Sequence, residues 1–378
     1  MPVRLLFWLF LSTVCLAGGI AAADPLPGTA PLVIDQPLDV IMLDGLHRFA
    51  DRELGASVER RAKLWQRDVS SSEAYEKSVA PNRERLRTII GAVDPRVEAR
   101  GLELIATALQ EAVVGRGKGY KVLAVRWPVL DGVTAEGLLL EPEGVAVARI
   151  VTLPDADWTP EQLVGLADGV PPESQFARRL AENGCQVLVP VLINRDDTFS
   201  GNPDVRFTNQ PHREYVYRQA FEMGRHIIGY EVQKVLAAVD QFTLLNKVRN
   251  QSLPIGVAGA GEGGLLALHS AALDTRIKAA LVSGYFGPRE KLWREPIYRN
   301  VWGLLTEFGD AEVLSLVAPR GIVIEVGAAP EVKGPPAVRQ GRAGAAPGEV
   351  LMPSTADVNR EFMRFAELQG KLRQYRVL

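Results

Sequence analysis

Six residues, 259–264, form a glycine-rich run between two apolar segments, and they read Gly-Ala-Gly-Glu-Gly-Gly. A strand, a tight turn and a helix in this order position a nucleophile when the turn reads Gly-x-Ser-x-Gly, in which the serine attacks an acyl carbon. In that frame Gly259 and Gly263 are the flanking glycines, and Gly261 stands at the place of the serine. Glycine has no oxygen with which to attack an ester. The sequence therefore predicts this turn without its nucleophile.

The histidine that would serve as base is also missing from its expected place. In this chemistry the nucleophile, the acid and the base follow one another along the chain, with the histidine after the last strand. No histidine occurs in residues 270–378, and the four in the chain are His47, His212, His226 and His269. Glu331 is the best candidate for the acid and Glu325 a poorer one. Either is more simply a solvated carboxylate, since an acid without a histidine has nothing to orient.

An anion site could survive without the nucleophile. The backbone amide of Glu262 would supply one donor, and the loop 154–158 after the third apolar strand would supply a second. Amides at the N-terminus of a helix attract anions. Against this, the side chains of Glu262, Asp155 and Asp157 would place negative charge nearby. Retained ligand binding, a purely structural glycine turn and catalysis by another route all remain open.

Two further residues are candidates for the same cleft. Arg195 lies in the run 194–197, directly after a strand, and His212 follows a proline in residues 210–213. Ligand groups gather where the strands of a parallel sheet end, which makes both residues candidates for a binding role. The alternatives are a solvated loop for Arg195 and a capping or packing role for His212.

The same glycines also match Gly-x-Gly-x-x-Gly, the fingerprint of dinucleotide-binding proteins. That fingerprint belongs at the first strand-to-helix turn of a sheet, and here several strands precede it. The strand over 279–284 also lacks the acidic residue that binds a ribose. We therefore expect no cofactor. The histidines show no metal-ligand spacing, so we expect no metal.

The elements that must position these residues alternate between strands and helices. Apolar runs predict strands over 120–127, 133–140, 149–153, 186–191, 254–258, 278–283 and 321–326, and helices over 176–182, 220–245, 265–273 and 356–370. Such alternation implies a mostly parallel sheet covered on both faces, an α/β class. Residues 37–110 are predicted to be helical, with Leu102, Ile105 and Leu109 at helical spacing. Residues 327–353, rich in Gly, Pro and Ala, are predicted to form a flexible lid or a disordered stretch.

Two segments carry a resemblance to a known group of proteins. Residues 225–240 resemble the helix before the nucleophile turn in dienelactone-hydrolase-like and acetyl-xylan-esterase-like proteins, and residues 271–277 resemble the segment after it. The resemblance covers about residues 119–330. It implies the α/β-hydrolase fold with a helical N-terminal extension like that of exported bacterial members. It also implies hydrolysis of a carboxylic ester through an acyl-enzyme, with a small ester, carboxylate or carbohydrate as ligand.

The first residues are typical of an export signal. Arg4 precedes the apolar stretch 5–16, and Ala21–Ala23 fits cleavage before Asp24. We predict a signal over 1–23, a helical segment over 24–115 and a hydrolase-like domain over 116–378. The stretch is short for a membrane anchor, and no second run of spanning length follows. The domain is also compatible with a truncated C-terminus, in which case a histidine would lie beyond residue 378.

Charge and cysteine content exclude several classes of partner. The net charge of −2 gives no reason to expect nucleic acid or an anionic membrane as partner. Without residues 1–23 a single cysteine remains, Cys185, so no internal disulfide is expected.

The sequence therefore predicts an exported protein of the hydrolase fold that is inactive as an esterase. The alternatives are a non-enzymatic ligand-binding or scaffolding protein, or a hydrolase with an unconventional nucleophile. On backbone strain alone, Gly261→Ser is expected to lower the free energy of unfolding by about 1 kcal/mol or less.

Overall fold

The computed structural model describes residues 26–29, 34–107, 111–200, 209–339, 341–369 and 376–377. The chain divides into two compact units, Met1–Asp51 and Arg52–Leu378. The export signal predicted over 1–23 lies outside the described residues and stays a prediction, as does the boundary near residue 115. Helix α1 (Leu38–Ala62) begins in the first unit. No helix in the described ranges is long and apolar enough to cross a membrane.

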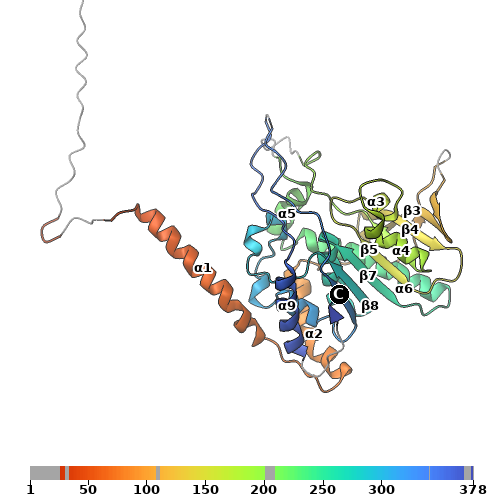
Figure 1. Ribbon diagram of the computed structural model, residues 1–378, viewed down its shortest axis with the longest axis horizontal. Coiled ribbons are helices and arrows are strands. Elements are labelled where there is room, and N and C mark those ends of the chain that lie inside the picture. Colours follow the sequence, from red (N-terminus) through yellow and green to blue (C-terminus); the bar gives the residue numbers. More distant parts are fainter. Residues whose placement is uncertain are drawn as a thin grey trace, which may run out of the picture. The chain divides into compact units, whose positions relative to one another are not determined.

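The second unit is built on one sheet (Figure 1), whose strands run in the order β1-β3-β4-β6-β5-β7-β8-β9-β10, with β2 beside β3. Neighbours from β6 to β10 pair in parallel, whereas β1 to β4 and the β4–β6 pair are antiparallel. The strands are β1 (Glu103–Leu104), β2 (Val113–Gly117), β3 (Tyr120–Leu130), β4 (Val133–Pro142), β5 (Arg149–Leu153), β6 (Gln186–Pro190), β7 (Ile255–Ala260), β8 (Ile277–Ser283), β9 (Gly321–Glu325) and β10 (Arg376–Val377).

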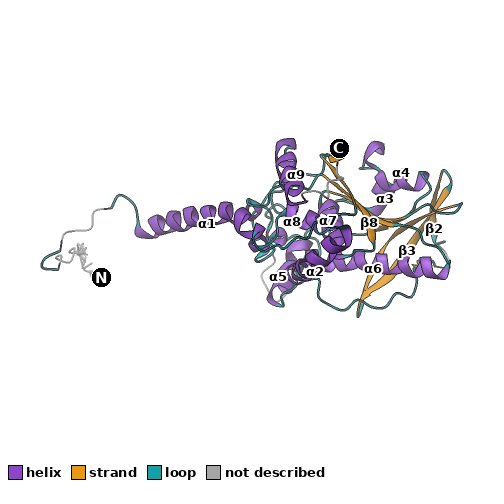
Figure 2. Ribbon diagram, turned by 90° about the horizontal axis from the view of Figure 1, so that it is seen from below, coloured by secondary structure: helices purple, strands orange, loops and turns teal. Residues whose placement is uncertain are grey.

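Helices cover both faces of this sheet (Figure 2), as parallel strands require. Helices α2, α6 and α7 lie on one face, and α3 and α4 lie on the other. The helices of the second unit are α2 (Ser72–Ile89), α3 (Pro160–Val164), α4 (Phe176–Glu182), α5 (His212–Glu222), α6 (Ile227–Val248), α7 (Glu262–Leu273), α8 (Asp310–Ser315) and α9 (Thr355–Gln369). The predicted α/β-hydrolase architecture is confirmed.

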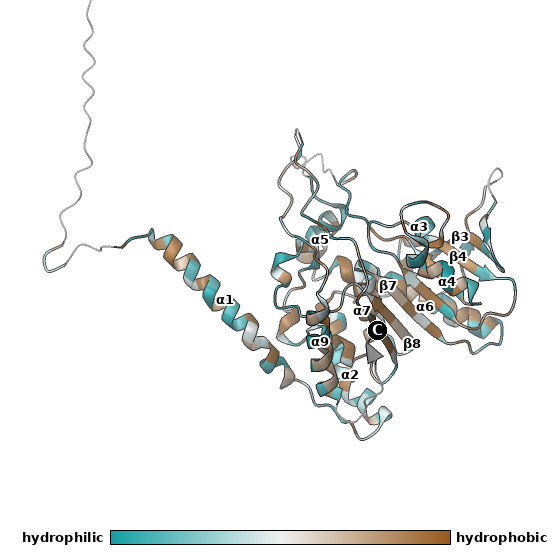
Figure 3. Cartoon of the chain, in the orientation of Figure 1, coloured by the Kyte–Doolittle hydropathy of each residue, from teal (hydrophilic) through white to brown (hydrophobic). Residues whose placement is uncertain are grey.

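The core lies between the central strands and these helices. Every residue of β6, β7 and α7 is buried. Residues of high hydropathy gather on β7, β8 and helix α7 (Figure 3), and the core includes residues of all three elements. A strand covered on both faces has no polar side, which is why these segments are continuous apolar runs in the sequence.

Two predictions about secondary structure were wrong in part. The helical spacing of Leu102 and Ile105 does not form a helix, because Glu103 and Leu104 pair with β3 instead. The helix predicted over 220–245 is two helices, α5 and α6, separated at His226, which caps α6. In each case tertiary pairing or a capping side chain overrode the local periodicity.

The segment 327–353 is neither a free lid nor without structure where it is described. Val332 and Val350 form a bridge between its two ends. The guanidinium of Arg339 binds both carboxylate oxygens of Asp197 at 2.7 Å. The amide of Ala345 donates to Asn209. The segment is therefore anchored to the loops that follow β6.

Candidate functional site

The turn between β7 and α7 has the backbone shape of a nucleophile elbow. Gly261 has φ 57° and ψ −118°, a conformation that side chains rarely adopt, and its amide donates to the carbonyl of Ser283 at 3.0 Å. The flanking glycines permit close packing of backbone on backbone. A Cβ on Gly259 would lie 2.0 Å from the carbonyl oxygen of Gly263, and one on Gly263 would lie 2.2 Å from that of Leu153. This packing therefore requires glycine at both positions, because any side chain there would clash with the backbone.

The carboxylate of Asp155 fills the space beside Gly261. Its Oδ2 accepts the amide of Glu262 at 2.9 Å, and its Oδ1 accepts the amide of Asp157 at 3.2 Å. These are the two places from which the sequence predicts oxyanion donors. The side chain of Asp155 is 1% exposed. A Cβ on Gly261 would lie 2.4 Å from Oδ2 of Asp155, so the missing side chain makes room for this carboxylate.

Arg195 joins the predicted cleft residues to one another. Its guanidinium binds both oxygens of Asp155, at 2.6 and 3.2 Å, and also Asp157 at 3.0 Å and Glu262 at 3.1 Å. The structure therefore brings Arg195, Asp155, Asp157 and Glu262 together, as the sequence suggests. Arg195 does lie in a loop, but the alternative of a solvated side chain is wrong, because only 5% of that side chain is exposed.

The side chain of Glu262 is fully buried among arginines. Arg213 binds one of its oxygens at 3.0 Å, and Arg299 binds the other at 2.8 Å. Burial alone would raise the pKa of Glu262, but Arg299, Arg213 and Arg195 outweigh it and hold that pKa well below its usual range. The carboxylate is ionised and paired, so it cannot act as a general acid at neutral pH.

Sequence analysis missed Arg213 and Arg299. Arg213 lies in the first turn of α5, and Arg299 ends a short 3-10 helix, Ile297–Arg299. The sequence did contain a signal for them. Glu262 opens a helix that consists mostly of apolar or small residues, so its carboxylate is expected to be buried. A buried carboxylate needs a countercharge. The identity of the countercharge was not readable, because Arg213 and Arg299 are 49 and 37 residues away.

The three histidines of the second unit have structural roles. His212 is the first residue of α5, and both of its ring nitrogens contact the loop before that helix. One accepts the amide of Phe199, and the other contacts Asn194 at 2.7 Å. His226 caps α6, and His269 contacts the carbonyl of Leu265 at 2.9 Å. Burial lowers the pKa of both His226 and His269 to about 4. The prediction that His212 caps or packs rather than serving the cleft is the one that these contacts favour.

The candidate acid Glu331 is exposed. In the described part of the chain it forms no ion pair with a histidine, so the geometry offers it nothing to orient. Nor do the described residues hold a group of three or more His, Cys, Asp and Glu side chains suited to a metal ion.

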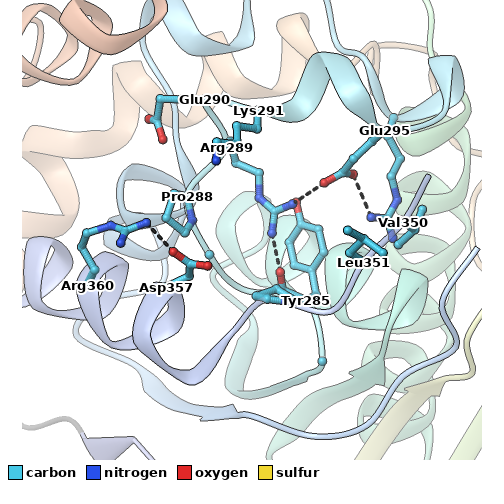
Figure 4. Close-up of a pocket in the computed structure, with 14 residues that line it drawn as sticks. Tyr285, Pro288, Arg289, Glu290, Lys291, Glu295, Val350, Leu351, Asp357 and Arg360 are labelled. Atoms are coloured by element: carbon cyan, nitrogen blue, oxygen red, sulfur yellow. Dashed lines mark hydrogen bonds and ion pairs between the residues drawn. The ribbon is translucent and has the colours of Figure 1, made fainter. Parts of the chain in front are cut away.

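A cavity of about 210 Å³, drawn in Figure 4, shares one residue with the charged side chains around Glu262. Arg299 belongs to both, since it lines the cavity and binds Glu262. Glu295 joins Arg299 to Arg289, at 2.8 and 3.2 Å, and Arg289 stacks 4.1 Å from the ring centre of Tyr285. Asp357 pairs with Arg360 at the rim. The wall of the cavity carries both apolar and charged side chains, and its charges are largely paired.

Comparison with known proteins supports the fold. A protein from Bacteroides fragilis assigned as an acetyl xylan esterase superposes with a TM-score of 0.50 at 16% identity, covering 69% of this chain and 70% of its own. A glucuronoyl esterase from Solibacter usitatus gives a TM-score of 0.48 at 12% identity, covering 82% and 85%. No family model matches the sequence, and no curated protein matches it either. The chain has the α/β-hydrolase fold, and its structural neighbours are esterases.

Proposed function

We propose that this chain is an exported α/β-hydrolase-fold protein that does not hydrolyse esters and acts by binding instead. One observation carries the proposal: the carboxylate of Asp155 occupies the amides of Glu262 and Asp157, beside a Gly261 that has no side chain. An acyl-enzyme mechanism needs a nucleophile and free oxyanion donors. Here glycine stands at the place of the nucleophile, and the oxyanion donors are bonded to the buried carboxylate of Asp155.

The electrostatics around the elbow support the same reading. Catalysis of acyl transfer depends on donors aimed at a place where negative charge develops. At this elbow full negative charges are already present on Asp155 and Glu262, and Arg195 pairs with both. A third anion in the same space would be repelled by two fixed carboxylates. The ion pairs at the elbow therefore stabilise the arrangement in which Asp155 is bonded to the two amides.

A binding function would use the cavity beside the elbow. Its walls carry the guanidinium of Arg289, the ammonium of Lys291 and the ring of Tyr285. A small carboxylate or carbohydrate ligand fits groups of this kind, since cations bind carboxylates and paired ions accept and donate to hydroxyls. Scaffolding without a small ligand is the alternative. Binding of acetate, glucuronate and xylo-oligosaccharides, measured by calorimetry, distinguishes the two.

The export part of the proposal rests on residues 1–23. Expression of the full chain with its natural N-terminus in a bacterial host should yield a processed protein outside the cytoplasm. Mass spectrometry of its N-terminus should find Asp24. An unprocessed chain retained in the cytoplasm would contradict export.

The catalytic part is tested with p-nitrophenyl acetate and a fluorophosphonate probe, with a serine-triad acetyl xylan esterase assayed in parallel. We expect no turnover above buffer and no covalent adduct, because removal of a triad serine costs on the order of 10⁶ in turnover. A burst of nitrophenol, or an adduct mapped to Ser283 or Ser270, would show an unconventional nucleophile and would overturn the proposal.

A further inference from the structure

The carboxylate of Asp155 is held as a bound ligand would be held. Each of its oxygens accepts one backbone amide and one guanidinium nitrogen: Oδ2 from Glu262 and Arg195, Oδ1 from Asp157 and Arg195. The distances lie between 2.6 and 3.2 Å. Planar, two-oxygen recognition of this kind is the geometry in which arginine binds carboxylates.

The donors come from three separate parts of the fold. The amide of Glu262 opens α7, the amide of Asp157 lies in the loop after β5, and Arg195 lies in the loop after β6. Arg195 keeps its position through further contacts that do not involve Asp155, among them the ion pair with Glu262 and a hydrogen bond to the hydroxyl of Tyr298 at 3.2 Å. The amide of Glu262 is fixed by the helix. The donor set would therefore persist if the carboxylate of Asp155 were removed.

We infer that these donors form a carboxylate-binding site that the chain occupies with its own Asp155. The inference rests on the proposed function, since it assigns the state of the same elbow. Because Asp155 is tethered next to its site, its effective concentration there far exceeds that of any free ligand. Gly261 is part of the device, since a Cβ at that position would meet Oδ2 at 2.4 Å. External carboxylates are kept out by occupancy, not by lack of donors.

The experiment removes the occupant and supplies it in solution. Asp155→Ala deletes a carboxylate of the size of formate and keeps Cβ. We expect sodium formate to raise the Tm of Asp155→Ala above its value in sodium chloride of equal ionic strength. At about tenfold its dissociation constant, formate should add about 2–4 °C. In the parent protein formate and chloride should give the same Tm, because the site is filled.

Two matched variants separate this site from general effects of anions. Asp157→Ala removes a 42% exposed carboxylate that pairs with the same Arg195 but does not accept the amide of Glu262. Asp155→Asn keeps an oxygen and the volume of the side chain, so the site stays full. Neither should respond to formate more than to chloride. If Asp157→Ala responds as strongly as Asp155→Ala, the effect belongs to Arg195 alone and the inference is wrong.

Other outcomes are equally decisive. If Asp155→Ala does not fold in chloride, refolding is repeated in formate, and recovery in formate alone supports the site. A variant that folds in neither salt, or that responds equally to both, overturns the inference. The proposed function fails separately, through nitrophenol release or a probe adduct in the parent protein, and neither result depends on the response to formate.

Discussion

The elbow consists of a backbone frame and a polar lining, and the two differ in what holds them. The frame is Gly259, Gly263 and Gly264, where an added Cβ would meet backbone atoms at 2.0 to 2.7 Å. The lining is Asp155, Arg195 and the other charged side chains that surround Glu262. The frame keeps the backbone shape of a nucleophile elbow, whereas in the lining the carboxylate of Asp155 accepts the amides of Glu262 and Asp157. Shape and chemistry at one turn are therefore separable.

The difference follows from how each part is encoded. Backbone packing between β7 and α7 has no substitute for glycine, so a change there damages the whole sheet. The lining consists of side chains, which can be exchanged if charge and hydrogen bonds stay balanced. The side chains around the elbow can therefore change while its backbone keeps the same form. The predictions that follow test this separation.

The largest effect is expected in the frame. Gly259→Ala would place a Cβ 2.0 Å from the carbonyl oxygen of Gly263, and neither strand nor helix can move without disrupting the core. We expect loss of soluble folded protein, or a destabilisation of more than about 4 kcal/mol, which only severe steric or burial defects cause. Gly55→Ala is the control, since a Cβ there meets nothing within 4 Å. Normal urea unfolding of Gly259→Ala would show that the frame is tolerant.

The next effect is expected in the lining. Glu262→Gln leaves Arg195, Arg213 and Arg299 without their shared countercharge in a fully buried place. Breaking a buried ion pair by removing one partner costs about 3–5 kcal/mol. Urea denaturation should show this loss. Glu182→Gln breaks the half-exposed pair with Arg178 and should change the free energy of unfolding by about 0.5 kcal/mol or less. Equal effects in both variants would mean that the elbow network has no special weight.

A smaller effect is expected at Gly261, where the frame and the lining meet. Gly261→Ala would put a side chain on a residue with an unfavourable φ and would place its Cβ 2.4 Å from the carboxylate of Asp155. It should therefore lower the free energy of unfolding by about 1–3 kcal/mol, more than backbone strain alone would. In an Asp155→Ala background that contact is gone, and the same substitution should cost about 1 kcal/mol less. A double-mutant cycle measures the difference. Strict additivity would mean that Gly261 does not serve to admit Asp155.

The frame could be predicted from the sequence, and the lining only in part. Strand, glycine turn and helix are local patterns, so β7, Gly261 and α7 were found where they lie. The vacancy at Gly261 needs only the identity of one residue. That Asp155 fills it depends on how the loop after β5 folds over α7, 107 residues away in sequence, and no local pattern reports that.

The histidines illustrate the same limit. No histidine occurs in residues 270–378, and this can be read without a structure. Sequence order does not reveal that His226 ends the loop before α6 and caps that helix, because the apolar periodicity runs on across it. A capping role depends on the backbone conformation at His226, which has φ −149° and ψ 148°. Its consequence appears in the pH dependence of stability.

The smallest effect concerns His226 and His269, whose pKa burial lowers to about 4 in the folded chain. In the unfolded chain each has a pKa of about 6.5. Between these values the unfolded state binds more protons, so the free energy of unfolding rises with pH and falls as pH drops from about 6.5 towards 4. Each histidine contributes at most about 1.4 kcal/mol per pH unit. His226→Asn keeps a capping acceptor for the amide of Ile228 and removes one of the two contributions.

The measurement compares His226→Asn with the parent between pH 5 and 6.5, two bounds set roughly by the histidine window. Buried Asp310 and Glu361, whose pKa values burial raises, affect stability with the opposite sign, but they are present in both proteins and cancel in the difference. The variant should therefore lose less stability per pH unit than the parent. Identical slopes would mean that burial does not hold His226 neutral in the folded chain.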